Sequence, residues 1–117
     1  MAEARRLICA STDLADGGAG IRFEVERGNT TASAFAVRHQ GKVYAYINRC
    51  AHIGVELDWV PGRFFDDSGL YLTCATHGAI YRPDDGTCVA GPCTGARLTT
   101  LPLVEQGGSV FLESHHG

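Results

Sequence analysis

The sequence predicts an all-β sandwich or small barrel, and three observations support this prediction. Short apolar segments recur along the whole chain, and its 15 glycines are spread among them. Two pairs of these segments are separated by glycine-containing turns of the hairpin type. No segment longer than about ten residues combines helical periodicity with a capping residue and a C-terminal glycine. Many short strands joined by many turns are typical of sandwiches and barrels.

The first clear strand signal covers residues 21–26, where apolar and polar side chains alternate with period two. Arg22, Glu24 and Glu26 would face water on one side of this strand. The apolar side chains between them would face the core.

Two hairpins follow from the turn residues. Residues 34–39 and 42–48 are rich in β-forming residues and are separated by Gln40-Gly41, with glycine supplying the positive φ of a two-residue turn. Residues 99–104 and 109–113 form the second hairpin, and Pro102 places the first of its strands at a sheet edge.

Residues 70–74 and 79–82 form two further short strands on either side of a loop. Candidate ligands in that loop would therefore lie between strands.

Length and composition indicate one soluble domain over residues 1–117, because 44% hydrophobic and 20% charged residues are ordinary for a globular chain of this size. The net charge of −3 offers no basic excess for nucleic acid. Arg5-Arg6 could begin an export signal, but Asp13 and Asp16 interrupt the apolar stretch after it. No stretch approaches the ~18 apolar residues of a membrane span. We expect a cytoplasmic protein without a membrane partner.

Five cysteines, an odd number in a chain without a secretion signal, favour metal chemistry over a disulfide framework. Cys88 and Cys93 are close enough in sequence to close a disulfide. A cytoplasmic setting favours free thiols with a structural role, and the sequence leaves their pairing open. Cys9, near the start of a predicted strand, is expected to be a buried apolar side chain.

The motif that carries chemistry has two parts, each followed by a glycine. Cys50 and His52 form C-x-H, and Cys74 and His77 form C-x-x-H. Two thiolates and two imidazoles can hold tetrahedral zinc, but zinc knuckles usually open with two cysteines two to four residues apart. A second alternative treats the four residues as unrelated core or surface side chains. That interpretation must explain why four metal-ligating side chains occur in paired loops.

The two motifs resemble those of the Rieske family, whose members carry C-x-H and C-x-x-H in two loops at one end of a β-sandwich. The resemblance implies one [2Fe-2S] cluster, with Cys50 and Cys74 on one iron and His52 and His77 on the other. It covers most of the chain from residue 34 onward, and places the cluster-binding part at about residues 48–95. Residues expected to surround the cluster are Gly54 and Gly78 after the two motifs, Tyr81, and Pro92 in a sequence that resembles the family's third, proline-containing loop.

Mixed ligation raises the potential of such clusters to about −150 to +300 mV. High-potential members carry a disulfide between the two loops, at positions that here hold Val55 and Thr76, and a serine at the position of Ala79. Those members also carry a tyrosine near the cluster, and this third feature is the one that the present sequence shares, as Tyr81. We therefore expect a low-to-intermediate potential, which replacing Tyr81 by Phe should lower.

The segment between the motifs is longer than in compact ferredoxins and is expected to form a flap or hairpin. Its aromatic residues, Trp59, Phe64 and Phe65, are expected to pack against the domain rather than to dock a partner. His39, His115 and His116 are expected to be solvated and without a role.

The resemblance implies a one-electron carrier, similar to the ferredoxin component of bacterial oxygenase systems, between a flavoprotein reductase and a terminal oxygenase or reductase subunit. No residue is assigned a catalytic role, because the chain has no room for the mononuclear iron domain of Rieske oxygenases. Two alternatives stay open: a Rieske-like small subunit of a reductase complex, and a redox-sensing module that binds a regulatory partner.

Overall fold

A computed structural model describes residues 5–51, 55–58, 60–76 and 78–113 of the chain. These residues form antiparallel strands and one 3-10 turn, η1 (Ser11–Asp13), and none of their helices could span a membrane. The strands are β1 (Arg5–Ala10), β2 (Ile21–Arg27), β3 (Thr30–His39), β4 (Lys42–Ile47), β5 (Leu72–Thr73), β6 (Ile80–Tyr81), β7 (Cys88–Ala90), β8 (Thr100–Leu101), β9 (Leu103–Gln106) and β10 (Ser109–Glu113).

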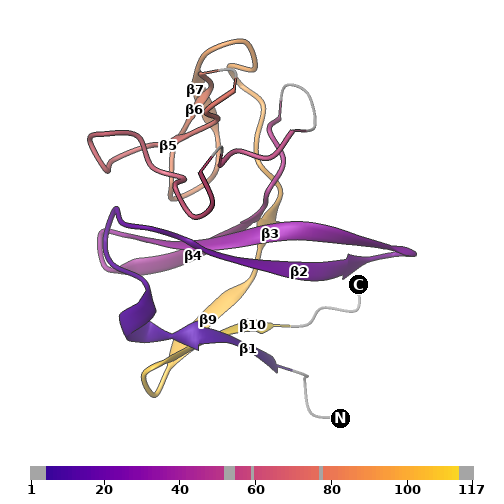
Figure 1. The fold of residues 1–117 in the computed structure, drawn as a ribbon, viewed down its shortest axis with the longest axis vertical. Helices are drawn as coiled ribbons and strands as arrows, with labels where there is room; N and C mark the ends of the chain where they lie inside the picture. Colours follow the sequence, from indigo (N-terminus) through magenta and orange to yellow (C-terminus); the bar gives the residue numbers. More distant parts are fainter. Residues whose placement is uncertain (1–4, 52–54, 59, 77, 114–117) are drawn as a thin grey trace.

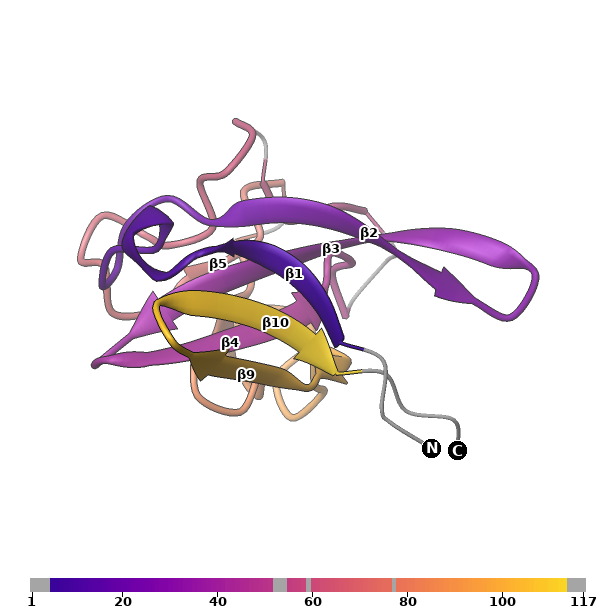
Figure 2. The ribbon, with the colours of Figure 1, turned by 90° about the horizontal axis from the view of Figure 1, so that it is seen from below.

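The strands form three sheets, in the orders β1-β10-β9, β2-β3-β4-β8 and β5-β6-β7. In Figure 1 the first sheet lies at the bottom, the second crosses the middle, and the small third sheet lies at the top among long loops. Seen from below, β1, β10 and β9 lie across the face of β2, β3 and β4 (Figure 2). The predicted all-β sandwich is confirmed. We call the sheets β1-β10-β9 and β2-β3-β4-β8 the body, and residues 48–98 the loop end.

Both predicted hairpins are present. In the first, His39 pairs with Lys42, and Gln40 and Gly41 both have positive φ, at 51° and 83°, as a type I′ turn requires. The second, β9–β10, turns through two glycines between Gln106 and Ser109. Arg22, Glu24 and Glu26 are exposed on β2, as their alternation predicts.

The predicted strand over residues 99–104 is wrong in one respect, because Pro102 divides it. β8 before the proline pairs with β4, whereas β9 after it pairs with β10 in the other sheet. Proline has no N–H to continue a ladder, and its carbonyl instead accepts the backbone N–H of Glu113 at 3.0 Å. Pro102 therefore marks the crossing from one sheet to the other.

Two further expectations need correction, and one strand was missed. The strands predicted over residues 70–74 and 79–82 shrink to the two-residue strands β5 and β6, because glycine turns and loop contacts take up their ends. β7 was not predicted, since only three residues form it. Cys9 is half-buried near the end of β1, beside an irregularity in the β1–β10 ladder.

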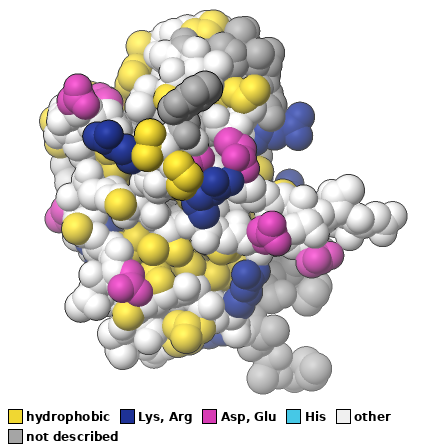
Figure 3. Space-filling model, viewed as in Figure 1, with side chains coloured by type: hydrophobic (Ala, Val, Ile, Leu, Met, Phe, Trp, Pro, Cys, Tyr) yellow, Lys and Arg dark blue, Asp and Glu magenta, His cyan; other side chains and the backbone are white. Residues whose placement is uncertain are grey.

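The central strand β3 is buried on both faces. Ala34 and Ala36 point into the core of the body, whereas Phe35 and Val37 belong to the core of the loop end. Small side chains let the two body sheets approach, and large ones fill the wider space under the loops. On the side of the body that faces the viewer, part of the apolar interior reaches the surface. Figure 3 shows hydrophobic side chains there, at the height between β1 and β2 in Figure 1.

One arginine links the layers of the body. From β3, Arg38 donates hydrogen bonds to the carbonyl of Leu14 at 2.7 Å and to the carbonyl of Ser11 at 3.2 Å. Its guanidinium also binds both carboxylate oxygens of Glu105 on β9, at 3.0 and 2.5 Å. Hydrogen bonding from Arg38 lowers the pKa of Glu105 from its ordinary 4.5 to about 2.

Candidate metal centre

The first predicted ligand, Cys50, follows the end of β4 by three residues and is 2% exposed. Its backbone N–H donates to the carbonyl of Val55 at 2.6 Å, which closes a tight loop. His52 and Gly54, both expected at the site, lie outside the described residues.

A buried polar pair braces this first loop. Asn48 and Asp58 are 3% and 7% exposed, and the Asn48 amide donates to the Asp58 carboxylate at 2.9 Å. The Asn48 amide oxygen accepts the N–H of Leu57 at 2.8 Å, and Asp58 accepts the N–H of Gly62 at 2.9 Å. The two side chains thus anchor Leu57 and Gly62, which follow Cys50 in the chain, to the end of β4.

Sequence reasoning missed this pair. A buried polar residue in a loop carries no periodic signal, because only the tertiary fold supplies its partners. The available hint was a polar residue at the end of an otherwise apolar strand, and that hint does not name Asp58.

The second loop carries Cys74, which is fully buried. The Cys74 N–H donates to the carbonyl of Ala79 at 2.9 Å, and the N–H of Gly78 donates to the carbonyl of Cys74 at 2.8 Å. Gly78 has φ +70°, the left-handed conformation that glycine adopts without cost. His77 lies outside the described residues.

The two loops are tied directly to each other. The backbone N–H of Ala75, next to Cys74, donates to the carbonyl of Leu57 at 3.0 Å. Cys50 and Cys74 also belong to one buried apolar core, in the loop end. The fold therefore brings the two predicted sulfur ligands, 24 residues apart in the chain, into the same region.

Tyr81 lies against Cys50, the first predicted ligand. Its hydroxyl oxygen is 3.3 Å from the Cys50 sulfur and 3.4 Å from the Cys93 sulfur, and it accepts the N–H of Ala51 at 3.0 Å. Burial, with hydrogen bonds to the two cysteines, raises the pKa of the Tyr81 hydroxyl, so it keeps its proton. When Cys50 is a thiolate it can only accept, so Tyr81 is the donor in that contact.

A third loop covers the second. Gly91 has φ +100°, and a Cβ at this position would lie 2.9 Å from the Cα of Ala79. The loop can approach this closely only because residue 91 has no side chain. Pro92, next in the chain, is exposed, so the structure places it on the outer surface of this loop.

Cys88 and Cys93 flank this loop as free thiols, and both are buried. Their sulfur atoms are 2.8 Å apart. Burial and the neighbouring Cys93 raise the pKa of the Cys88 thiol to about 11.

The donor set fits an iron–sulfur site. Thiolates are the ligands that iron–sulfur clusters use, and the Cys50 and Cys74 side chains are shielded from water in one core. Within the described ranges no group of three metal-ligating side chains lies together, and the two predicted histidines fall outside those ranges.

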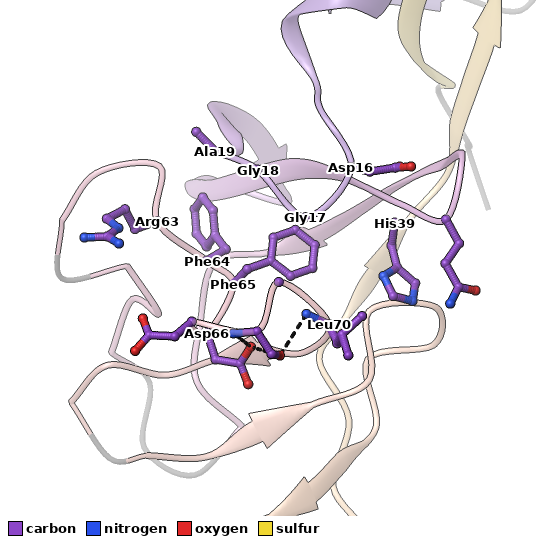
Figure 4. A pocket seen from close by; sticks show the side chains of 14 residues that line it. Asp16, Gly17, Gly18, Ala19, His39, Arg63, Phe64, Phe65, Asp66 and Leu70 are labelled. Atoms are coloured by element: carbon purple, nitrogen blue, oxygen red, sulfur yellow. Dashed lines mark hydrogen bonds between the residues drawn. The ribbon is translucent and has the colours of Figure 1, made fainter.

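A groove of about 690 Å³ lies elsewhere, between the β3–β4 turn and residues 63–70. Figure 4 shows His39 and Phe65 facing this groove, and none of its lining residues is a predicted ligand. His39 was expected to be solvated, but it is half-buried, and its ring centroid is 6.4 Å from that of Phe65.

The aromatic residues of the inter-motif segment pack as expected where they are described. Phe64 is fully buried and stacks on Phe35 with ring centroids 3.9 Å apart. Phe65 is partly buried and pairs with Leu72 in an isolated antiparallel bridge, which makes the predicted hairpin-like turn. Trp59 lies outside the described residues.

A model of the family described as the Rieske [2Fe-2S] domain matches residues 5–106. The chain belongs to this family. Membership implies one Rieske-type [2Fe-2S] cluster, which agrees with the two predicted sulfur ligands, Cys50 and Cys74, in the core of the loop end. The family match reaches into the first thirty residues, where the sequence offered only a strand pattern.

Solved structures show the same fold, although curated protein sequences include no significant match. The Sphingomonas yanoikuyae B1 ferredoxin is 20% identical with TM-score 0.71, and the match covers 96% of this chain and all of that chain. A complex of reduced oxygenase and oxidized ferredoxin in carbazole 1,9a-dioxygenase matches at 23% identity and TM-score 0.71, covering 93% of this chain and 92% of the matched chain.

A fluorene-bound oxygenase and ferredoxin complex of carbazole 1,9a-dioxygenase has TM-score 0.75 at 23% identity. Here the match covers 92% of this chain, which spans only 28% of the matched chain. At these identities the likeness establishes the Rieske fold.

Proposed function

We propose that this chain is a one-electron carrier of an oxygenase-type redox system, folded as a single domain over residues 1–117. Its cluster-binding part is residues 48–95, and the ligands are Cys50, His52, Cys74 and His77. The observation that carries the proposal is the Tyr81 hydroxyl, 3.3 Å from the sulfur of Cys50 in a family whose domain binds a [2Fe-2S] cluster.

The described residues of the loop end support electron transfer through a hydrogen-bond donor to Cys50 and through contacts that hold the loops. A bound cluster supplies reversible one-electron transfer. Tyr81 can donate to the Cys50 thiolate, and such a bond strengthens as negative charge on the sulfur increases. The Asn48–Asp58 pair and the Ala75–Leu57 backbone bond hold the two ligand loops in place, so they need little rearrangement when charge changes.

The extent of the matches supports the choice of carrier. The chain spans all of the Sphingomonas ferredoxin and 92% of a matched chain in an oxygenase–ferredoxin complex. By this analogy its electron donor is a flavoprotein reductase and its acceptor a terminal oxygenase. We place the protein in the cytoplasm. We expect no nucleic-acid partner, because a net charge of −3 offers no basic excess for the phosphate backbone.

The test begins with anaerobic purification, iron and sulfide analysis, and electron paramagnetic resonance of the dithionite-reduced protein. Two irons, two sulfides and the low average g of a histidine-ligated cluster are expected. Zinc without a reducible cluster would contradict the proposal.

The carrier role needs a second assay. NADH, a flavoprotein ferredoxin reductase and cytochrome c are combined, and cytochrome reduction should increase with the concentration of this protein. Cys74→Ser should abolish the increase, while the matched control Cys9→Ser should retain it. A loaded cluster that accepts no electrons from the reductase, but changes the affinity of a regulatory protein, would favour the redox sensor instead.

A further inference from the structure

The loop end contains two thiols that the proposed cluster does not use. Cys88 begins β7, and Cys93 lies five residues later, beyond the exposed loop that carries Gly91. Their sulfur atoms are 2.8 Å apart, and the side chains are 1% and 8% exposed. The Tyr81 hydroxyl links this pair to the first predicted ligand, since its oxygen is 3.4 Å from the Cys93 sulfur and 3.3 Å from the Cys50 sulfur.

The backbone enforces this juxtaposition. The N–H of Cys88 donates to the carbonyl of Ala96 at 2.8 Å, and the N–H of Gly95 donates back to the carbonyl of Cys88 at 2.9 Å. The N–H of Ala96 also donates to the carbonyl of Cys93 at 2.8 Å. These bonds close the segment into a compact loop with both sulfurs on its inner side. A disulfide bond is about 2.05 Å long, so the sulfurs need to approach by less than about 1 Å.

We propose that Cys88 and Cys93 are a redox-active dithiol that a small-molecule disulfide of the glutathione class converts to an intramolecular disulfide, and that Tyr81 transmits this change to Cys50. The transmission to Cys50 rests on the proposed function, whereas the dithiol chemistry does not.

The reaction balances in two exchange steps. The Cys93 sulfur, the more exposed of the two, attacks the small disulfide and forms a mixed disulfide, and one small thiol leaves with a proton. The Cys88 sulfur then displaces the second small thiol, which takes the second proton. Two protein thiols are oxidised and one small disulfide is reduced to two thiols. In a reducing compartment the pair stays a dithiol until the glutathione pool becomes oxidised.

The reduced pair has a defined hydrogen-bond pattern. The Cys93 thiol donates to the Cys88 sulfur, and the Cys88 thiol donates to the carbonyl of Ala90 at 3.2 Å. The single proton of Tyr81 then faces two sulfur acceptors, Cys93 and Cys50. Oxidation holds the Cys93 sulfur in a bond to Cys88, so Tyr81 donates more fully to Cys50. A stronger donor to a ligand sulfur stabilises the reduced cluster, so the disulfide form should have the higher midpoint potential.

The first test uses the cluster-loaded protein and oxidised glutathione under anaerobic, mildly alkaline conditions, with the cluster followed by its visible absorbance. Remaining thiols are alkylated after denaturation, and peptides are mapped by mass spectrometry. A Cys88–Cys93 disulfide with an intact cluster is expected. Cys88→Ser should stop at one glutathione on Cys93, and the control Cys9→Ser should behave as the native chain does.

Two results would overturn the dithiol: full alkylation of both cysteines after treatment, or a disulfide that includes Cys50 or Cys74 with loss of absorbance. Neither result depends on a redox partner, so a failure here is distinguishable from a failure of the carrier role.

The second test compares the midpoint potentials of the dithiol and disulfide forms. A positive shift on oxidation is expected, and it should disappear in Tyr81→Phe. Equal potentials in the two native forms, or an equal shift without the Tyr81 hydroxyl, would show that Tyr81 does not couple the pair to the cluster.

Discussion

The body and the loop end of this protein are held together in different ways. In the body, β2 and β3 pair over seven residues and β3 and β4 over six, so continuous ladders hold the chain. In the loop end, the strands β5, β6 and β7 have only two or three residues each. There the positions of the loops depend on glycine turns, on the Asn48–Asp58 pair, and on contacts among sulfur atoms and Tyr81.

The difference shows where single substitutions should act. A ladder distributes its stability over many backbone hydrogen bonds, each worth only about 1 kcal/mol net. A loop held by one buried polar side chain loses its support when that side chain is removed. Substitutions in the loop end should therefore disturb the metal centre while the body stays folded.

The largest expected effect follows removal of a proposed sulfur ligand. Cys74→Ser should abolish iron binding, because a serine hydroxyl is a poor substitute for a thiolate on iron. The far-ultraviolet circular dichroism of the body should persist, and Cys9→Ser should keep its iron. Loss of the body's spectrum along with the iron would show that the two regions are not separable.

The second largest effect is expected at Asn48, whose side chain holds the first loop. Asn48→Ala should destabilise the protein by about 2–3 kcal/mol and increase the rate of iron loss, because it leaves the Leu57 N–H and the Asp58 carboxylate without their buried partner. Chemical unfolding and release of iron to a chelator measure the two effects. Asn29→Ala, in the exposed β2–β3 turn, is the control and should change neither.

The close approach of the second and third loops can be tested with two glycines of similar conformation. Gly91 and Gly95 have φ +100° and +94°, but only at Gly91 would a Cβ meet a neighbour, the Cα of Ala79 at 2.9 Å. Both alanine variants carry the strain of a positive φ, about 1 kcal/mol. Gly91→Ala should be the more destabilising in urea unfolding, and equal losses would mean that the loops do not need this approach.

In the body, the Arg38–Glu105 pair should contribute about 1 kcal/mol, because it is bidentate but partly exposed. The depressed pKa of Glu105 means that this contribution is complete above its ordinary pKa of 4.5 and is lost as the pH falls towards about 2. Glu105→Gln should therefore be less stable than the native chain at neutral pH, with the difference vanishing in acid. Urea midpoints across this pH range measure it, with Glu24→Gln as the exposed control.

The smallest expected effect is a change in the midpoint potential of the cluster. Tyr81→Phe should lower the midpoint potential by about 40 mV, the equivalent of a hydrogen bond that favours the reduced state by about 1 kcal/mol. Tyr44→Phe is the control and should leave the potential unchanged. Protein-film voltammetry gives both values, and an unchanged potential in Tyr81→Phe would remove this hydroxyl from the tuning of the cluster.

Local rules were enough to predict both hairpin turns, the alternation in β2 and the candidate ligands. The alternation in β2, the Gln40-Gly41 and Gly107-Gly108 turns, and the spacing of Cys50 and Cys74 from their histidines are all readable within a few residues. Backbone conformation and ligand spacing depend on neighbours in the chain, so a single sequence carries them.

Only the tertiary structure decided the remaining features, because each depends on residues distant in the chain. Pro102 divides a strand between two sheets, a division that depends on what pairs on either side of it. The burial of Asn48 depends on Asp58, and the position of Tyr81 between Cys50 and Cys93 depends on the packing of three loops. The sequence by itself determined the fold class, the predicted ligand set and the turns that form the hairpins. Packing decided which polar and sulfur atoms meet around the metal centre, since hydrogen bonds and burial are properties of the assembled core.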